Sequence, residues 1–277
     1  MIYLLLAILS SALVSIIMRI SEKYINNNIM MLVTNYLMCF LLAGYYMGYD
    51  RVITTQSGIL VTLLLGIING IFYLSSFILL QKNVKENGVV LSSTFMKLGV
   101  MVPTLLSIVV FHEQPRMIQI IGFIFALVAI VIMNYEKGTK FSFQIGLLLM
   151  LLINGSADAM SKIYQEVGNS NLSDHFLFYT FVFAFVLCLI LGISKKQKIG
   201  KEEIVFGLLI GIPNYYSARF LLLSLEHVAA IIAYPTYSVA TIITVSTVGI
   251  LIFKEKLLKK QILGITLILI ALVLLNI

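Results

Sequence analysis

Two long apolar segments of this sequence carry polar side chains at helical spacing. Residues of these types at these positions could bind a charged molecule or transfer a proton. Within residues 143–163, Asn154, Asp158 and Lys162 follow one another at intervals of four. Residues four apart lie on one face of an α-helix, so the segment predicts a polar stripe carrying an acid and a base. Such a stripe could hold a charged small molecule, and Asp158 could carry a proton. Alternatively, Asp158 and Lys162 neutralise each other, and Lys162 extends toward the membrane surface.

Residues 2–20 present a similar stripe, with Ser11, Ser15 and Arg19 at intervals of four. These three positions coincide with the stripe of residues 143–163 at a constant offset of 143. We therefore expect two related helices with polar faces turned toward a common axis. Arg19 lies near the end of its segment, where anchoring of the helix end competes with a role in a cavity.

Two further basic residues lie inside apolar segments. A charged side chain within a bilayer costs at least about 2.5–3.5 kcal/mol and usually faces a partner or a water-filled cavity. Lys97 lies about eight residues into its segment, and we expect it to line a cavity. Arg219 follows Tyr215 by four residues, and we expect it to clamp a substrate or to pair with Asp158.

Other candidates are less specific. Amide and aromatic side chains that could form cavity walls, or could simply pack or lie at the membrane interface, are Asn69, Tyr73, Tyr215, Tyr234 and Tyr237. Prolines within apolar segments remove a backbone donor, so candidate kinks or gates are Pro103, Pro213 and Pro235. The histidines are His112, His175 and His227, and they show no metal-ligand spacing. No nucleophile motif or phosphate-binding glycine loop is present, so we predict no catalytic residue, metal or cofactor.

The elements that position these residues follow from composition. The sequence is 60% hydrophobic and only 11% charged, with a mean hydropathy of +1.04, whereas soluble domains are roughly 25% charged. A helix needs about 20 apolar residues to span a bilayer, and runs such as Ile118–Met133 lack the strict alternation of membrane β-strands. We predict an all-α integral membrane protein with about ten transmembrane helices, near residues 2–20, 29–49, 58–80, 89–111, 116–134, 143–163, 174–193, 203–224, 229–252 and 260–276.

Basic residues are distributed unevenly among the loops. The odd-numbered loops carry fourteen lysines and arginines, whereas the even-numbered loops carry two, Arg51 and Arg116. Cytoplasmic loops are enriched in lysine and arginine, so we predict a multi-pass cell-membrane protein whose odd-numbered loops are cytoplasmic. The net charge of +7 is explained by these loops and does not indicate a nucleic-acid partner.

The two halves of the sequence resemble each other. Residue pairs that share an offset of 142 are Glu113 and Glu255, Gln119 and Gln261, Gly122 and Gly264, and Asn134 and Asn276. Gly66 and Asn69 similarly resemble Gly211 and Asn214. We predict two five-helix repeats, residues 1–137 and 138–277, and an odd helix number inverts the second copy in the membrane. Glu113 and Glu255 each precede a repeat's last helix, where a carboxylate suits the positive N-terminal dipole.

Paired five-helix units, each closing with a glutamate, a Q-x-x-G motif and a final apolar helix, resemble the EamA-type drug/metabolite transporter superfamily. The resemblance covers essentially the whole chain and implies transport of a small metabolite, often outward. The polar residues favour an amino acid or a related carboxylated or zwitterionic compound, with H⁺ or Na⁺ as a possible coupling ion. Organic cations are the alternative substrates, and a polytopic membrane enzyme or a structural membrane subunit are the alternatives from other classes.

Overall fold

The computed structural model describes residues 2–49, 54–103, 106, 116–134, 145–225 and 230–274. In this part of the chain the regular structure is entirely helical, which confirms the all-α expectation. The helices are α1 (Ile2–Ser21), α2 (Asn28–Met47), α3 (Ile59–Asn87), α4 (Val89–Leu98), α6 (Met117–Asn134), α7 (Ile145–Val167), η2 (Ser170–Leu172), α8 (Ser173–Ser194), α9 (Lys201–Leu225), α10 (Ala230–Leu251) and α11 (Lys259–Leu274). Each of the ten predicted segments corresponds to one α-helix of the described part of the chain.

Two helices differ in extent from the prediction. α3 continues to Asn87 rather than stopping near residue 80, because its polar last two turns consist of residues compatible with a helix. Lys82 and Glu86 form an i,i+4 ion pair of 4.0 Å there, and the helix ends at Gly88, which has a φ of 81°. Apolar periodicity stops before this extension, so the prediction ended too early.

The helix predicted over 89–111 is interrupted. α4 ends at Leu98, a turn follows at Gly99 and Val100, and residues 101–103 and 106 are again helical. A Cβ on Gly99 would lie 2.9 Å from the backbone nitrogen of Gly155 in α7, so two glycines let α4 and α7 touch backbone to backbone. Residues 104–111, apart from 106, lie outside the described residues, as does the expected repeat boundary between residues 137 and 138.

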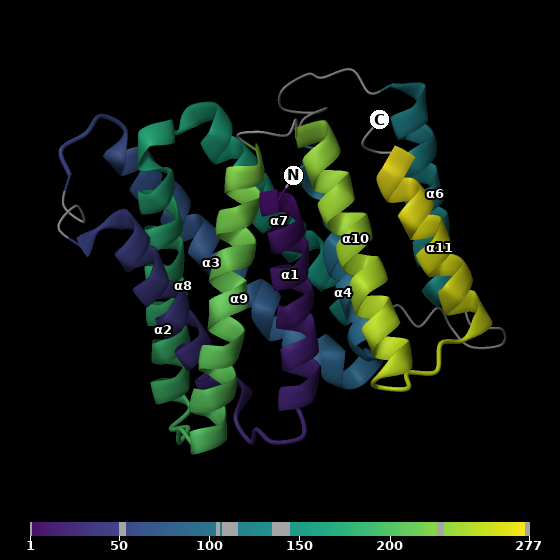
Figure 1. Cartoon of the computed structure of the whole chain (residues 1–277), viewed down its shortest axis with the longest axis horizontal. Helices are drawn as coiled ribbons and strands as arrows, with labels where there is room; N and C mark the ends of the chain where they lie inside the picture. The colour runs from purple at the N-terminus through teal and green to yellow at the C-terminus, as the bar shows by residue number, and fades with distance from the viewer. Residues whose placement is uncertain are drawn as a thin grey trace.

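The halves of the chain interleave. α1 packs against α9 and α10 from the second half, and α7 packs against α3 and α4 from the first half. α2 packs against α8, α4 against α10, and α6 against α11, the last pair at one edge of the bundle (Figure 1). The main contacts of one half are therefore repeated in the other: α1 meets α9 and α10, and its counterpart α7 meets their counterparts α3 and α4. This pattern is typical of two copies related by an internal two-fold axis.

The aligned glycine and asparagine motifs perform the same packing role in both halves. Asn69 of α3 donates to Thr180 of α8 at 3.4 Å, and Asn214 of α9 donates to Asn35 of α2 at 3.3 Å. Gly66 and Gly211 lie one turn before these asparagines and face the same partner helices. Small residues let membrane helices approach closely, and polar side chains then bond across the interface.

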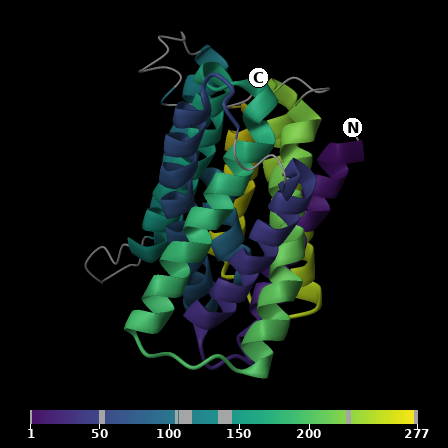
Figure 2. The same ribbon diagram turned by 90° about the vertical axis from the view of Figure 1, so that its left-hand side faces the viewer.

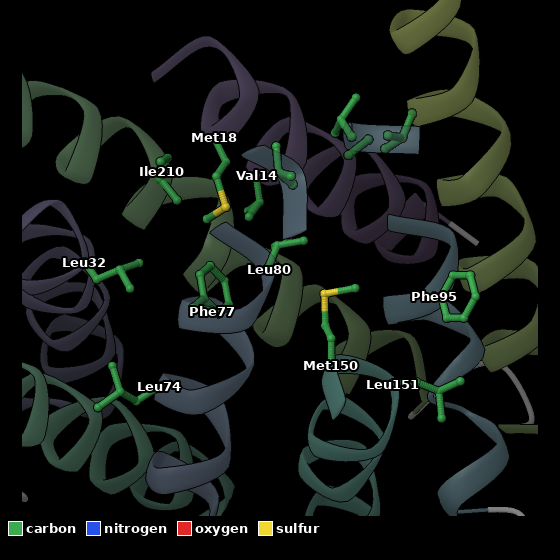
Figure 3. Packing of buried hydrophobic residues seen from close by; sticks show 14 of the residues in the cluster. Val14, Met18, Leu32, Leu74, Phe77, Leu80, Phe95, Met150, Leu151 and Ile210 are labelled. Atoms are coloured by element: carbon green, nitrogen blue, oxygen red, sulfur yellow. The ribbon is translucent and has the colours of Figure 1, made fainter. Parts of the chain in front are cut away.

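The hydrophobic core fills the space between these helices. Met18, Phe77, Leu80 and Ile210 lie close together where α1, α3 and α9 meet (Figure 3), and each is at most 4% exposed. Large apolar side chains such as Leu60 and Ile243 point outward, where lipid can cover them. Among the described helices, five are long and apolar enough to cross a membrane: α1, α2, α3, α9 and the combined segment Ser170–Ser194.

The described odd-numbered connections lie at one end of the bundle. The connections α1–α2, α8–α9 and α10–α11 appear together at the lower end of Figure 1, and the α8–α9 connection is again at the lower end in Figure 2. We call this end, formed by residues 22–27, 88, 195–200 and 252–258, the lysine-rich end. It carries Lys23, Lys195, Lys196, Lys198, Lys254 and Lys256. The α2–α3 connection lies at the opposite end.

Candidate functional site

A cavity lies in the middle of the bundle where the two halves meet. Six helices line it: α1, α3 and α4 from the first half, and α7, α9 and α10 from the second. The cavity has a volume of about 70 Å³ and is partly open to solvent. Its polar lining consists of Ser11, Ser15, Tyr73, Ser76, Lys97, Asn154, Asp158, Asn214, Ser217 and Tyr237.

The two polar stripes found in the sequence both contribute to this lining. Ser11 and Ser15 of α1 and Asn154 and Asp158 of α7 all border the cavity. Helical spacing of four residues places each pair on one face, and the interleaved packing turns both faces inward. The part of the α1 stripe that borders the cavity is neutral, whereas the corresponding part of the α7 stripe carries a carboxylate, so the two halves contribute different charges to the cavity.

Asn154 orients the carboxylate of Asp158. Its amide nitrogen donates to the Met96 carbonyl oxygen at 3.1 Å and to an Asp158 carboxylate oxygen at 3.4 Å. Its amide oxygen accepts from the Ser76 hydroxyl at 3.0 Å. The side chain of Asn154 is thus held by α3 and α4, and Asp158 remains partly exposed toward the cavity. A carboxylate held this way can receive an ammonium group or a proton from the cavity.

Lys97 supplies the opposite charge from the other half of the chain. Its side chain is nearly buried, with 8% of the residue exposed. The ammonium nitrogen lies 3.7 Å from the ring centroid of Tyr237 in α10, and it also attracts the Asp158 carboxylate. The Tyr237 hydroxyl in turn lies 2.9 Å from the Ser217 hydroxyl. A cation against a ring face is stabilised by about 2 kcal/mol when desolvated, so Tyr237 holds Lys97 at the cavity wall.

Three predicted cavity residues lie outside this lining. Arg219 forms an ion pair of 2.6 Å with Asp174 at the start of α8, donates to the Tyr215 hydroxyl at 3.1 Å, and lies over the Tyr46 ring. Arg219 therefore has a partner other than Asp158. Tyr215 is fully buried. Asn69, the third, bonds to α8 as described above, and its role is helix packing.

The remaining predicted residues have different outcomes. Tyr73 lines the cavity. The side chains of Lys162, Tyr234 and Pro235 lie outside the described residues. Pro213 lies within α9, and Pro103 is buried at the end of the short helical turn that follows α4.

Several cavity residues have no clear signal in the sequence. Ser76 and Ser217 are small polar residues in apolar helices, where hydroxyls commonly bond to their own backbone. Tyr237 was expected only as a wall residue, and its contact with Lys97 joins helices far apart in the chain. Asn214 could be noticed because it aligns with Asn69, although only Asn214 lines the cavity.

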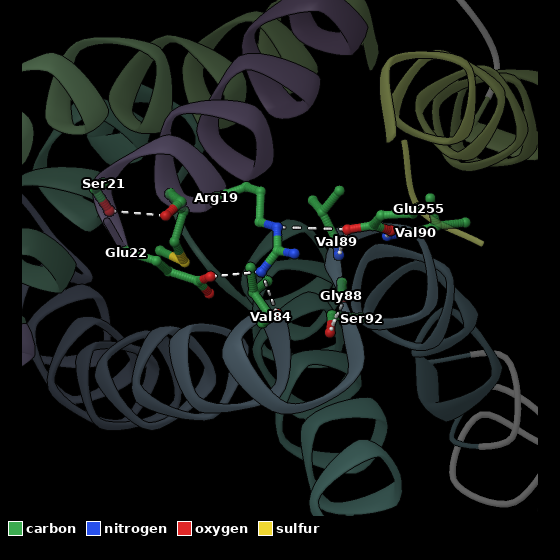
Figure 4. A network of polar contacts seen from close by, with 10 residues as sticks. Arg19, Ser21, Glu22, Val84, Gly88, Val89, Val90, Ser92 and Glu255 are labelled. Atoms are coloured by element: carbon green, nitrogen blue, oxygen red, sulfur yellow. Dashed lines mark hydrogen bonds and ion pairs between the residues drawn. The ribbon is translucent and has the colours of Figure 1, made fainter. Parts of the chain in front are cut away.

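A charged network connects several helix ends at the lysine-rich end. The Arg19 guanidinium donates to Glu22 at 2.6 Å and to the Val84 carbonyl oxygen at 3.3 Å, and its Nε lies 3.5 Å from a Glu255 carboxylate oxygen (Figure 4). Burial raises the pKa of the Glu22 carboxyl above its ordinary value, and the charge of Arg19 opposes this shift. Arg19, expected as an anchor, thus also links the two halves.

Glu255 acts on a different helix than expected. Its two carboxylate oxygens accept from the backbone N–H groups of Val89 at 2.8 Å and Val90 at 3.2 Å. It therefore satisfies the N-terminus of α4 in the first half, rather than that of α11, which follows it. The expected interaction of a carboxylate with a helix N-terminus is present, but the chain folds it onto the other repeat. Glu113 lies outside the described residues.

Comparisons with known proteins agree with this architecture. A crystal structure of another protein superposes with a TM-score of 0.62 over 99% of this chain and 94% of that chain, at 13% identity, which shows a shared fold. An uncharacterized protein of Haemophilus influenzae is 24% identical over 280 residues, which span 95% of this chain and 93% of the relative. The EamA-like transporter family matches twice, at residues 1–135 and 143–277. The chain therefore belongs to the EamA-like transporter family, within the drug/metabolite transporter superfamily.

Proposed function

We propose that this transporter carries a small zwitterionic or carboxylated organic metabolite, such as an amino acid, through the central cavity. One observation carries the proposal: a lysine and an aspartate from opposite halves line the same cavity among hydroxyl and amide groups. Lys97 would receive the carboxylate of the substrate, and Asp158 would receive its amine. Hydrogen bonds between charged groups are stronger than those between neutral groups. Lys97 and Asp158 would therefore each select the oppositely charged end of the substrate.

The proposed mechanism is alternating access between inverted repeats. The cavity lies at the interface of the halves, which is where such transporters bind substrate. We further propose that the lysine-rich end faces the cytoplasm, in accordance with the distribution of basic residues, and that transport is outward. The boundary near residue 137 would then separate the two repeats that move against each other.

Asp158 is also our candidate for coupling to protons. It is the carboxylate among the described residues that line the cavity, and a carboxyl group in a membrane cavity can alternate between a proton and a substrate amine. Substrate and proton would then compete for the same group, which is a simple route to exchange. Sodium coupling or exchange between two metabolites is the alternative.

Transport into liposomes tests the proposal. The purified protein would be reconstituted and supplied with labelled amino acids, their decarboxylated amines and their deaminated acids, with and without a pH gradient. We expect the zwitterions to accumulate above the level of empty liposomes, and a proton gradient to increase the rate. Movement of organic cations alone would replace the proposal by its main alternative.

A further inference from the structure

Glu255 joins four segments at the lysine-rich end. Its carboxylate contacts Arg19 at the end of α1 and the first two residues of α4, while Arg19 contacts Val84 at the end of α3 (Figure 4). Glu255 itself lies in the connection between α10 and α11. The network thus connects the second half of the chain to three helix ends of the first half.

The carboxylate fits the start of α4 closely. The first N–H groups of a helix have no partner within the helix, and they attract negative charge. Gly88, which precedes α4, has a φ of 81°, a conformation that side chains rarely adopt. A Cβ on Gly88 would lie 2.9 Å from both carboxylate oxygens of Glu255. The absence of a side chain at Gly88 therefore lets the carboxylate rest directly on the backbone.

The network lies next to the floor of the cavity. Ser15, which lines the cavity, precedes Arg19 by one helical turn of α1. Between the cavity and the lysine-rich end, Met18, Leu80 and Val84 are completely buried. A solute in the cavity can reach the lysine-rich end only if these helices separate, and the charged network holds them together just beyond this apolar layer.

We propose that Glu255 is a positioning residue for transport: it closes the cavity at the lysine-rich end by holding the start of α4 against Arg19. Release of Glu255 from Arg19, Val89 and Val90 opens this end. The proposal rests on the proposed function, since a closure of this kind has a purpose only in a transporter. It also connects the closure to substrate binding, because α4 carries Lys97 two turns beyond the residues that Glu255 holds.

Access of a thiol reagent to the cavity tests this proposal without any substrate. Ser15→Cys would be introduced together with Cys39→Ala and Cys188→Ala, which remove both native thiols. A membrane-impermeant maleimide would be applied to vesicles that expose either the lysine-rich end or the opposite end. Its labelling rate at residue 15 then measures how often each end opens.

We expect Glu255→Gln to raise the labelling rate from the lysine-rich end about tenfold, which corresponds to roughly 1.4 kcal/mol in the opening equilibrium. Arg19→Gln should act in the same direction and serves if Glu255→Gln folds poorly. Glu86→Gln is the matched control, because Glu86 is 54% exposed and paired only with Lys82 among the described ion pairs. This control should keep the rate of the parent protein.

Two results would overturn the proposal. One is an unchanged labelling rate from the lysine-rich end in both Glu255→Gln and Arg19→Gln. The other is an equal increase from both ends, which would indicate general loosening of the fold rather than release of one closure. Because labelling requires no transported compound, the closure can be confirmed even if no zwitterion is carried, and it can fail even if one is.

Discussion

Replacing Lys97 by methionine should weaken binding of a carboxylated substrate without unfolding the protein. Methionine keeps an unbranched apolar side chain close to the length of the lysine stem and removes the ammonium group. An interaction with a charged group contributes about 1.5–3 kcal/mol, which corresponds to roughly 10- to 150-fold in Kd. Lys97 is only 8% exposed, so water screens little of this interaction and the upper part of the range is expected.

The expected change in folding stability on replacing Lys97 by methionine is small. A charged residue within the membrane costs at least about 2.5–3.5 kcal/mol, and the Tyr237 ring returns about 2 kcal/mol of this. Lys97→Met removes both contributions together with the attraction between Lys97 and Asp158, and Asp158 keeps its contact with Asn154 and with the cavity. We expect folding stability to stay within about 1 kcal/mol of the parent protein. A lysine that only stabilised the fold would give a clear loss.

Calorimetric titration of the detergent-solubilised protein provides the assay. An amino acid and its decarboxylated amine would be titrated into the parent protein and into Lys97→Met. The amino acid should bind 10- to 150-fold more weakly to the variant, and the amine should bind at least as well as before. Lys82→Met is the control, because Lys82 is 62% exposed in the last two turns of α3 and lies outside the cavity lining. Equal weakening of both ligands, or unchanged binding of the amino acid, would refute the assigned role of Lys97.

Three further predictions concern the fold and the network. Gly155→Leu should reduce the folded yield and the melting temperature, because its side chain would collide with the Gly99 carbonyl oxygen at a cost of about 1–3 kcal/mol; an unchanged melting temperature would show that the helices can separate freely. Arg219→Lys should destabilise the protein by only about 1 kcal/mol, because the ion pair that it weakens includes the partly exposed Asp174. It should leave substrate affinity unchanged, since Arg219 lies outside the cavity lining; weaker substrate binding in a titration would contradict this. Since burial raises the pKa of Glu22 above 4.5, its folding advantage is present below that value and is lost as pH rises through the folded-state pKa. The melting temperature of the parent protein relative to Glu22→Gln should therefore rise as pH falls toward 4.5, and a flat difference would exclude the shift.

The sequence was sufficient to predict where the helices lie along the chain and which polar residues share a helix face. Apolar length identified the helices, and spacing of four residues identified the stripes that contain Ser15 and Asp158. Lys97 was placed in a cavity because an isolated membrane lysine needs a partner. These inferences use only the local geometry of one helix, and local geometry is what a single sequence determines best.

Contacts between helices far apart in the chain could not be predicted in the same way. Arg219 was expected to clamp a substrate or to pair with Asp158, yet it pairs with Asp174, because helix spacing does not reveal which helix a side chain faces. Glu255 holds α4 rather than α11 because the repeats interleave. The contact of Lys97 with Tyr237 also crosses between repeats. Each of these pairs joins residues at least 45 positions apart, so only the packed arrangement brings them together.

Transport of a matched pair of compounds tests the central claim most directly. An amino acid and its decarboxylated amine would be supplied to liposomes that contain the parent protein, Lys97→Met or Asp158→Asn. We expect the parent protein to prefer the amino acid, Lys97→Met to lose this preference, and Asp158→Asn to transport neither well. Transport of the amine alone by the parent protein, or equal amino-acid transport by all three proteins, would contradict a cavity in which Lys97 and Asp158 select the substrate.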